Sequence, residues 1–156
     1  MITSDRHLID DIRAASRQMV RELGFMDATL AATDYPPSAV HAILEIGIRG
    51  PTTAGQLAEV LHLEKSSVSR MVRKLVACGE LKETSDNADA RVKPLALTPR
   101  GRRTLTALHD FGRRQVAGAL AQLSEAERHT VREGLMLYAR ALRASQMVDA
   151  AMDPAA

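Results

Sequence analysis

Apolar residues recur along most of the chain at the spacing of one face of an α-helix. Three long segments, at about 4–24, 99–123 and 124–147, place an apolar residue at every third or fourth position, which is the pattern of an amphipathic helix. Between the first two, shorter helices are predicted to begin at Ser38 and Thr53, whose hydroxyls can cap a first turn, and a third short helix follows them. The pattern predicts a mostly α protein.

A β-hairpin is predicted directly after the third short helix. Two segments with strand character, 81–84 and 92–98, flank a run of turn-forming and charged residues, 85–91. Pro94 has no N–H to donate to a ladder, so its strand is expected at the edge of the sheet. Thr98 precedes a proline and is expected to cap the long helix that follows.

Composition limits the compartment and the class of protein. The chain has 156 residues, the size of one domain, and only 3% are aromatic, so the core must consist of aliphatic residues and methionine. No apolar run approaches the ~18 residues of a membrane span, and no basic flank followed by an apolar block opens the chain, so a cytoplasmic protein is expected. The single cysteine, Cys78, suits a reducing compartment. We expect it to be a buried or partly buried structural thiol, with oxidant sensing left open.

Charge is distributed unevenly along the chain. The net charge is only +2, but residues 65–114 carry 12 Lys and Arg against five Asp and Glu, a net +7, while the remainder carries −5. Clustered basic side chains attract polyanions and gain free energy by releasing counterions from phosphates. This distribution indicates a nucleic acid as partner, although a charge run is also common on an ordinary solvated face.

Two of the short helices, joined by a tight turn at 62–64, predict a helix-turn-helix. The outer face of the second helix is polar and basic, and the hairpin after it carries Arg91, where a winged helix-turn-helix enters the minor groove. Asp89 is expected to orient Arg91 through a charge-assisted hydrogen bond. The predicted DNA-contacting residues are Thr53, Lys65, Ser66, Ser67, Ser69, Arg70, Arg73, Lys74, Arg91 and Lys93.

Three motifs carry a resemblance to a known family. They are the run Glu64-Lys65-Ser66-Ser67-Val68-Ser69-Arg70-Met71-Val72, the hairpin motif Asp89-Ala90-Arg91, and Leu97-Thr98-Pro99-Arg100-Gly101 at the start of the long helix. In sequence and spacing they resemble the MarR (multiple antibiotic resistance regulator) family, and the likeness extends from the first helix to Leu142.

The resemblance implies a fold and a function. It implies a winged helix-turn-helix at about 38–98 and dimerisation helices at about 4–24, 99–123 and 124–147, in a single MarR-like domain over 1–156. Members bind double-stranded DNA as homodimers, and many are repressors released by small ligands or oxidation. We therefore expect a ligand- or stress-responsive repressor acting on a near-palindromic operator. An effector is expected near Arg17 and His41, between the dimerisation helices and the winged region.

Two other classes of function compete with this interpretation. An enzyme is disfavoured because the chain has no glycine-rich phosphate loop, no GxSxG and no HExxH. The five histidines are scattered without ligand spacing on any one helix, so neither a metal nor a cofactor is expected. The alternative that stays open is a helical dimeric interaction module without sequence-specific DNA binding.

Overall fold

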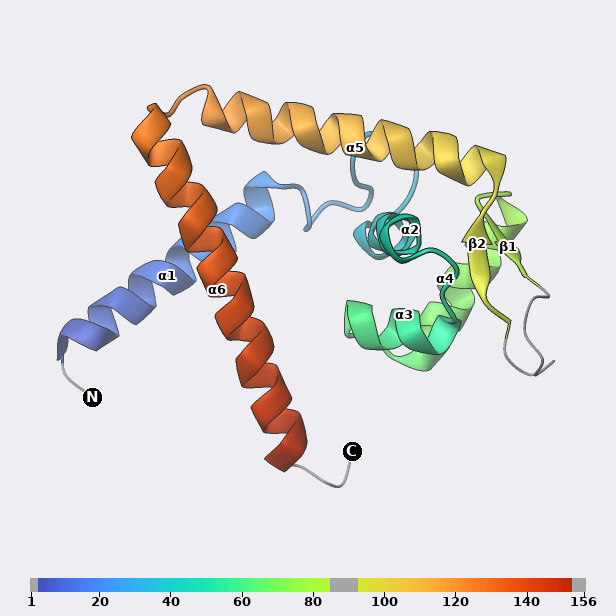
Figure 1. Cartoon of the computed structure of the whole chain (residues 1–156), viewed down its shortest axis with the longest axis horizontal. Helices are drawn as coiled ribbons and strands as arrows, with labels where there is room; N and C mark the ends of the chain where they lie inside the picture. Colours follow the sequence, from blue (N-terminus) through green and yellow to red (C-terminus); the bar gives the residue numbers. More distant parts are fainter. Residues whose placement is uncertain (1–2, 85–92, 153–156) are drawn as a thin grey trace. The chain divides into compact units, whose positions relative to one another are not determined.

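The structure, a computed structural model, describes residues 3–84 and 93–152. The chain divides into two compact units, residues 1–112 and 113–156, which are described separately. The predicted mostly α fold with one small hairpin is confirmed (Figure 1). In chain order the elements are α1 (Thr3–Glu22), α2 (Pro37–Arg49), α3 (Ala54–Leu61), α4 (Lys65–Ala77), β1 (Leu81–Glu83), β2 (Leu95–Leu97), α5 (Pro99–Leu120) and α6 (Glu125–Met152).

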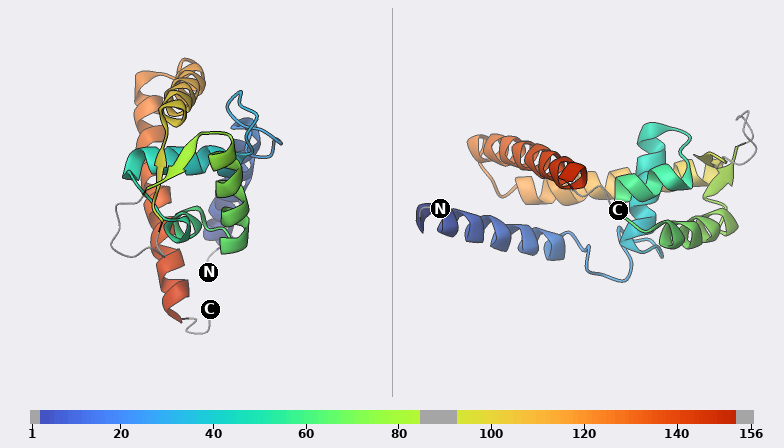
Figure 2. Two further views of the ribbon diagram at one scale, coloured as in Figure 1. Left: turned by 90° about the vertical axis from the view of Figure 1, so that its right-hand side faces the viewer. Right: turned by 90° about the horizontal axis from the view of Figure 1, so that it is seen from below.

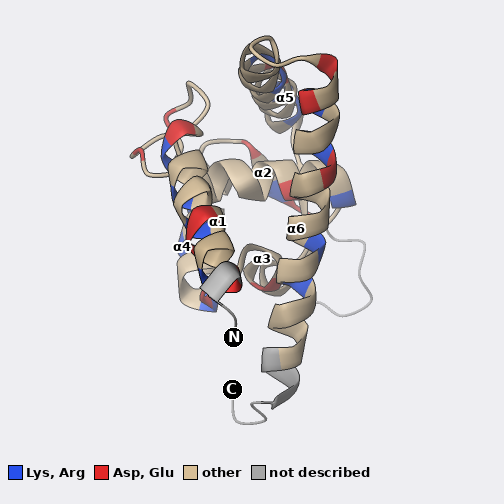
Figure 3. Ribbon diagram, turned by 90° about the vertical axis from the view of Figure 1, so that its left-hand side faces the viewer, with Lys and Arg blue, Asp and Glu red and all other residues tan. Residues whose placement is uncertain are grey.

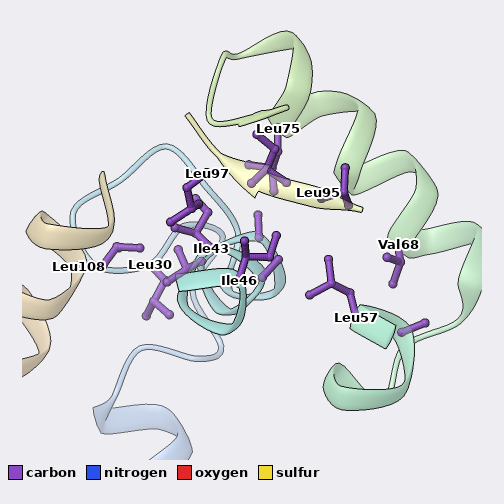
Figure 4. Close-up of a cluster of buried hydrophobic side chains, with 14 residues drawn as sticks. Leu30, Ile43, Ile46, Leu57, Val68, Leu75, Leu95, Leu97 and Leu108 are labelled. Carbon is purple, nitrogen blue, oxygen red and sulfur yellow. The ribbon is translucent and has the colours of Figure 1, made fainter. Parts of the chain in front are cut away.

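The core of the first unit is built around α2. This helix packs against α3, α4 and β2, and Figure 2 shows these elements gathered in one lobe. Ile43 and Ile46 on α2 meet Leu57 of α3, Leu75 of α4 and Leu95 of β2 in a single apolar cluster (Figure 4). Burying each such side chain contributes about 1.5–3 kcal/mol relative to exposure. The cluster therefore fixes α4, whose outer face carries the predicted DNA contacts, to a rigid base.

The helix-turn-helix has the local geometry that its sequence indicates. Thr53 caps α3 in a capping box, with its hydroxyl accepting from Gln56 N (3.1 Å) and the Gln56 side chain accepting from Thr53 N (2.9 Å). His62 ends α3 in the left-handed conformation at φ 52°, which His tolerates better than most residues. The α2 start differs from the prediction. Pro36 occupies the N-cap position and the helix begins at Pro37, so Ser38 lies in the first turn and caps nothing.

The hairpin is shorter than predicted, and one of its strands has a further backbone partner outside the sheet. Its strands are three residues each, antiparallel, with Glu83 opposite Leu95. On its other side Leu95 exchanges two backbone hydrogen bonds with Thr52 (2.9 and 3.0 Å). In this two-stranded sheet β2 is an edge strand, as expected from Pro94, although the isolated bridge to Thr52 pairs Leu95 on its outer side. Pro94 lies just before β2, where its carbonyl accepts from Thr84 N (2.8 Å) and no donor is needed.

Helices α1 and α6 expose their apolar residues. Every described side chain of α6, residues 125–148, is exposed, and those of α1 are exposed except for the half-buried Ser16. The large apolar residues concerned are Leu8, Ile9, Ile12, Met19 and Val20 on α1, and Val131, Leu135, Met136, Leu137, Tyr138, Leu142, Met147 and Val148 on α6. Among the described residues, no helix combines the length and hydropathy that crossing a membrane requires.

Candidate nucleic-acid interface

Helix α4 separates its apolar and polar residues cleanly. Val68 and Leu75 are 0% and 1% exposed and join the core. Ser66, Arg70 and Arg73 lie four and three residues apart on the opposite face, and all three are exposed. Figure 3 shows Lys and Arg along α4 in blue. The flanking Lys65, Ser69 and Lys74 are also exposed and Ser67 is half-buried, so six of the seven predicted α4 residues are exposed.

The predicted residues outside α4 have different surroundings. Thr53 is half-buried, and its oxygen serves the capping box, while a hydroxyl keeps one O–H to donate. Lys93 pairs with Glu83 on β1 at 3.1 Å, and both side chains are more than half exposed. An exposed ion pair of this kind adds little stability. Lys93 can therefore leave Glu83 and pair with another anion at little cost in free energy. Asp89 and Arg91 lie outside the described residues.

A buried acid behind α4 was missed by sequence reasoning, which counted it only as a charge of the basic segment. The Glu80 side chain is 2% exposed. Its Oε1 accepts from the Tyr35 hydroxyl (2.9 Å) and from Arg100 Nε (3.1 Å). Its Oε2 is buried without a partner among the described residues. Burial and the bond to Glu80 raise the pKa of Tyr35 to about 12. The available signal was an acid directly after Gly79, where a helix end commonly places an apolar residue.

A pocket of about 540 Å³ lies between the start of α2 and α4. Tyr35, Arg70, Met71, Lys74 and Cys78 are among its lining residues. The expectation of a buried or partly buried Cys78 is wrong, because the thiol is exposed. The residue sits at the C-cap of α4, after the last turn that packs on the core.

The two predicted effector residues do not line this pocket. His41 is half-buried and its ring lies edge-on to Phe25, with 5.4 Å between ring centroids. Arg17 is exposed on α1. Within residues 3–84 and 93–152, no group of three or more His, Cys, Asp or Glu is arranged to hold a metal ion.

Comparison with known proteins relates part of the chain to a known family. Residues 33–92 match the model of the MarR family. A "probable transcriptional regulator" from Pseudomonas aeruginosa is similar at 27% identity, with a TM-score of 0.66 over 84% of this chain and 98% of that one. Comparison with curated protein sequences finds no significant match.

Two further solved structures share the fold at lower identity. Streptococcus pneumoniae FabT, solved in complex with DNA, is 22% identical with a TM-score of 0.72, over 88% of this chain and 97% of that one. Bordetella bronchiseptica BpsR, whose DNA binding is regulated by 6-hydroxynicotinic acid, is 18% identical with a TM-score of 0.66, over 83% and 98%. The expectation of a transcription regulator rather than an enzyme is confirmed at the level of the family. The match and the fold confirm the resemblance: residues 33–92 match the MarR family of transcription regulators, and the described residues share the fold of the similar solved structures.

Proposed function

We propose that the chain is a homodimeric regulator that binds double-stranded DNA sequence-specifically at a near-palindromic operator, as a ligand- or stress-responsive repressor. The observation that carries the proposal is the exposed α4 face of Ser66, Arg70 and Arg73, backed by the buried Val68 and Leu75. FabT, which shares the fold, was solved with DNA. In this proposal α4 is the recognition helix and the chain is one domain, with its winged region at about 38–98.

The chemistry of this face suits both base edges and phosphates. Arg70 and Arg73 can each present a planar fork of donors to a guanine edge, the commonest specific contact in the major groove. Lys65 and Ser66 lie in the first turn of α4, where backbone N–H groups favour an anion. The proposed DNA-contacting residues are Thr53, Lys65, Ser66, Ser67, Ser69, Arg70, Arg73, Lys74, Arg91 and Lys93, with Asp89 orienting Arg91.

Binding to selected duplexes tests the proposal. Genomic fragments retained by the immobilised protein supply the operator, and fluorescence anisotropy then measures its Kd. Affinity is expected to fall by roughly a thousandfold between about 50 and 200 mM salt. Arg70→Ala or Arg73→Ala is expected to cost about 1–3 kcal/mol and to relax preference at one base position. Arg13→Ala, on α1 and paired with Asp10, is the matched control and should bind as wild type.

DNA affinities that depend neither on the duplex sequence nor on Arg70 and Arg73 favour the alternative function. If the wild type binds all duplexes equally weakly, and Arg70→Ala and Arg73→Ala change nothing, the chain is a helical interaction module without sequence-specific DNA binding.

The homodimer is supported by the exposed apolar faces of α1 and α6. Isolated exposed apolar residues are common on monomers, but large contiguous groups mark interaction surfaces. On α6, Val131, Leu135, Tyr138 and Leu142 follow one another at steps of four, three and four residues and form such a stripe. In the proposed two-fold symmetric dimer, the stripes of the two chains cover each other. The two recognition helices of the dimer then meet half-sites whose centres are about 10 bp apart.

The proposed effector is a small anionic or aromatic molecule. The fold is shared with BpsR, whose DNA binding responds to 6-hydroxynicotinic acid. We place the effector between the dimerisation helices and the winged region, facing Arg17 and His41. A panel of phenolic and acidic compounds, metals and oxidants is added to the operator complex. A releasing compound should lose its effect in Arg17→Ala or His41→Ala, and a panel without effect on DNA affinity contradicts ligand responsiveness.

A further inference from the structure

Glu80 occupies the position where α4 is terminated. Gly79 adopts φ 76°, its N–H donates to Val76 O (2.9 Å), and Glu80 N donates to Leu75 O (2.9 Å). This pair of bonds is a Schellman motif, in which the residue after the left-handed glycine commonly makes an apolar contact with the helix. Here that residue is an acid whose side chain is 2% exposed. Packing alone does not account for an acid at this place.

The burial of Glu80 is costly and only partly compensated. A carboxylate taken out of water loses hydration free energy that an ion pair restores only with good geometry and with further hydrogen bonds to its remaining lone pairs. Both of its donors, Tyr35 and Arg100, bond the same oxygen, Oε1. The other oxygen, Oε2, has no partner among the described residues. The Arg100 side chain is itself 61% exposed, so an apolar residue in place of Glu80 would leave no buried charge.

Three segments far apart in the chain meet at this carboxylate. Tyr35 belongs to the segment before α2, Glu80 follows α4, and Arg100 lies in the first turn of α5. The backbone is tight at the same junction: Thr98 N donates to Glu80 O (3.0 Å), and a Cβ on Gly101 would overlap that oxygen. The side chain of Glu80 is therefore held at a fixed point where a small displacement moves the end of α4 relative to α5.

We propose that Glu80 is a positioning residue for DNA binding, which sets the orientation of α4 relative to α5 through Arg100 and to the start of α2 through Tyr35. This inference rests on the proposed function. In a symmetric dimer, the orientation of each recognition helix on its own chain sets the distance between the two helices. Glu80 thus influences which spacing between the two DNA half-sites the dimer binds most tightly, without contacting DNA itself.

Binding to operators of altered spacing measures this role. Kd is determined for the selected operator and for versions with one base pair added or removed at its centre. Glu80→Leu is expected to reduce the preference for the native spacing by about fivefold or more, the lower range of coupling between distant sites. Its midpoint of urea unfolding should be unchanged or higher, because a buried charge is removed. A merely structural role predicts the opposite pattern, a lower midpoint with unchanged preference.

Two further variants keep the test decisive if Glu80→Leu does not fold. Tyr35→Phe and Arg100→Gln each remove one donor from partly exposed side chains and leave no cavity. Each should lower the spacing preference, and neither should lower it further in a Glu80→Leu background. Glu45→Leu is the matched control, since Glu45 is also an acid paired with an arginine, Arg49 (2.8 Å), but its side chain is 28% exposed. This variant should keep the native preference.

Other results overturn the proposal. A wild-type spacing preference in Glu80→Leu, or in both Tyr35→Phe and Arg100→Gln, excludes the positioning role. A further loss on adding Arg100→Gln to Glu80→Leu would mean that Arg100 contacts DNA itself. If the wild type does not bind DNA, the proposed function fails, and amide hydrogen exchange still reports on Glu80. Faster exchange at residues 75–80 and 98–102 in Glu80→Leu is expected, and unchanged exchange contradicts the link between α4 and α5.

Discussion

At the scale of single residues, Gly101 shows how closely the first turn of α5 approaches the backbone of Glu80, directly before β1. A Cβ at this position would overlap the carbonyl oxygen of Glu80, which is backbone and cannot rotate away. Gly101→Ala is therefore expected to lower the free energy of unfolding by about 1–3 kcal/mol, the usual cost of inserting atoms into a packed region. Urea denaturation at fixed protein concentration measures the loss.

A second glycine of the same helix is the control. Gly112 has open space where a Cβ would lie, so Gly112→Ala should leave stability unchanged or raise it by about 0.5–1 kcal/mol. If Gly101→Ala instead gains stability as Gly112→Ala does, helix propensity rather than the contact with Glu80 decides the outcome.

Arg91 carries the residue-scale prediction for the wing, which rests on the sequence because 85–92 lie outside the described residues. Minor-groove readout is degenerate, so Arg91→Ala should weaken binding to all A·T-rich flanks similarly and leave the core preference intact. Asp89→Ala should have part of this effect, because Arg91 loses its orienting partner. Affinities for the cognate, core-mutated and G·C-flanked sites at one salt concentration provide the test. If Arg91→Ala binds every duplex as wild type does, the wing does not enter DNA.

Structural features that depend only on residues a few positions apart were predictable from the sequence. The capping box of Thr53 and the left-handed His62 follow from local backbone chemistry, and the exposed face of α4 follows from helical spacing. The Glu80 cluster was not predictable, because Tyr35 and Glu80 are separated by 45 positions and burial of an acid depends on tertiary packing. The exposure of Cys78 was missed for the same reason, since a thiol at a helix end has no local signal for burial.

At the scale of elements, α6 begins with a capping box that makes its start sensitive to pH. Ser124 N and Oγ both donate to the Glu127 carboxylate, at 2.8 and 2.7 Å, and these bonds lower the pKa of Glu127. Because the pKa of Glu127 is lower in the folded than in the unfolded state, its capping bonds contribute stability that is fully present above the unfolded-state pKa, near 4.3. This stability is lost as pH falls through the folded-state pKa. Protonation of Glu127 should therefore loosen the first turn of α6 in acid.

NMR titration of the Glu127 carboxyl checks this expectation. Its pKa should lie below the model-peptide value in the wild type and return toward it in Ser124→Ala. Thr130→Ala, which removes a hydroxyl bonded one turn later to Ala126 O (3.0 Å), is the control and should leave the Glu127 titration unchanged. An identical titration in wild type and Ser124→Ala would exclude the capping box in solution.

Element boundaries show where sequence patterns are weaker than packing. The long helices were predicted to within a few residues because their periodicity extends over many turns. The strands were predicted too long, and the bridge between Leu95 and Thr52, which joins positions 43 residues apart, was not predicted. Local alternation cannot report such a pairing.

At the scale of the whole molecule, assembly is the property on which the proposed function depends most. Sedimentation equilibrium is expected to give about 34 kDa, twice the 17.0 kDa of one chain, because two-fold association buries the α6 stripe. Leu135→Glu should shift the mass to that of one chain and reduce operator affinity, since each half-site would then bind alone. Arg132→Glu, also on α6 and 64% exposed, is the control. A monomeric wild type at micromolar concentration would contradict the dimer.

The full exposure of α6 also has a consequence for how long a newly made chain survives. A helix gains most of its stability in a protein from packing its apolar face, and no described side chain of α6 is buried within a single chain. If the chain dimerises as proposed, α6 is therefore exposed to proteases until a second copy covers its apolar stripe. The proposed pairing would protect that helix by mass action, so turnover is expected to be slower at high than at low concentration of the chain.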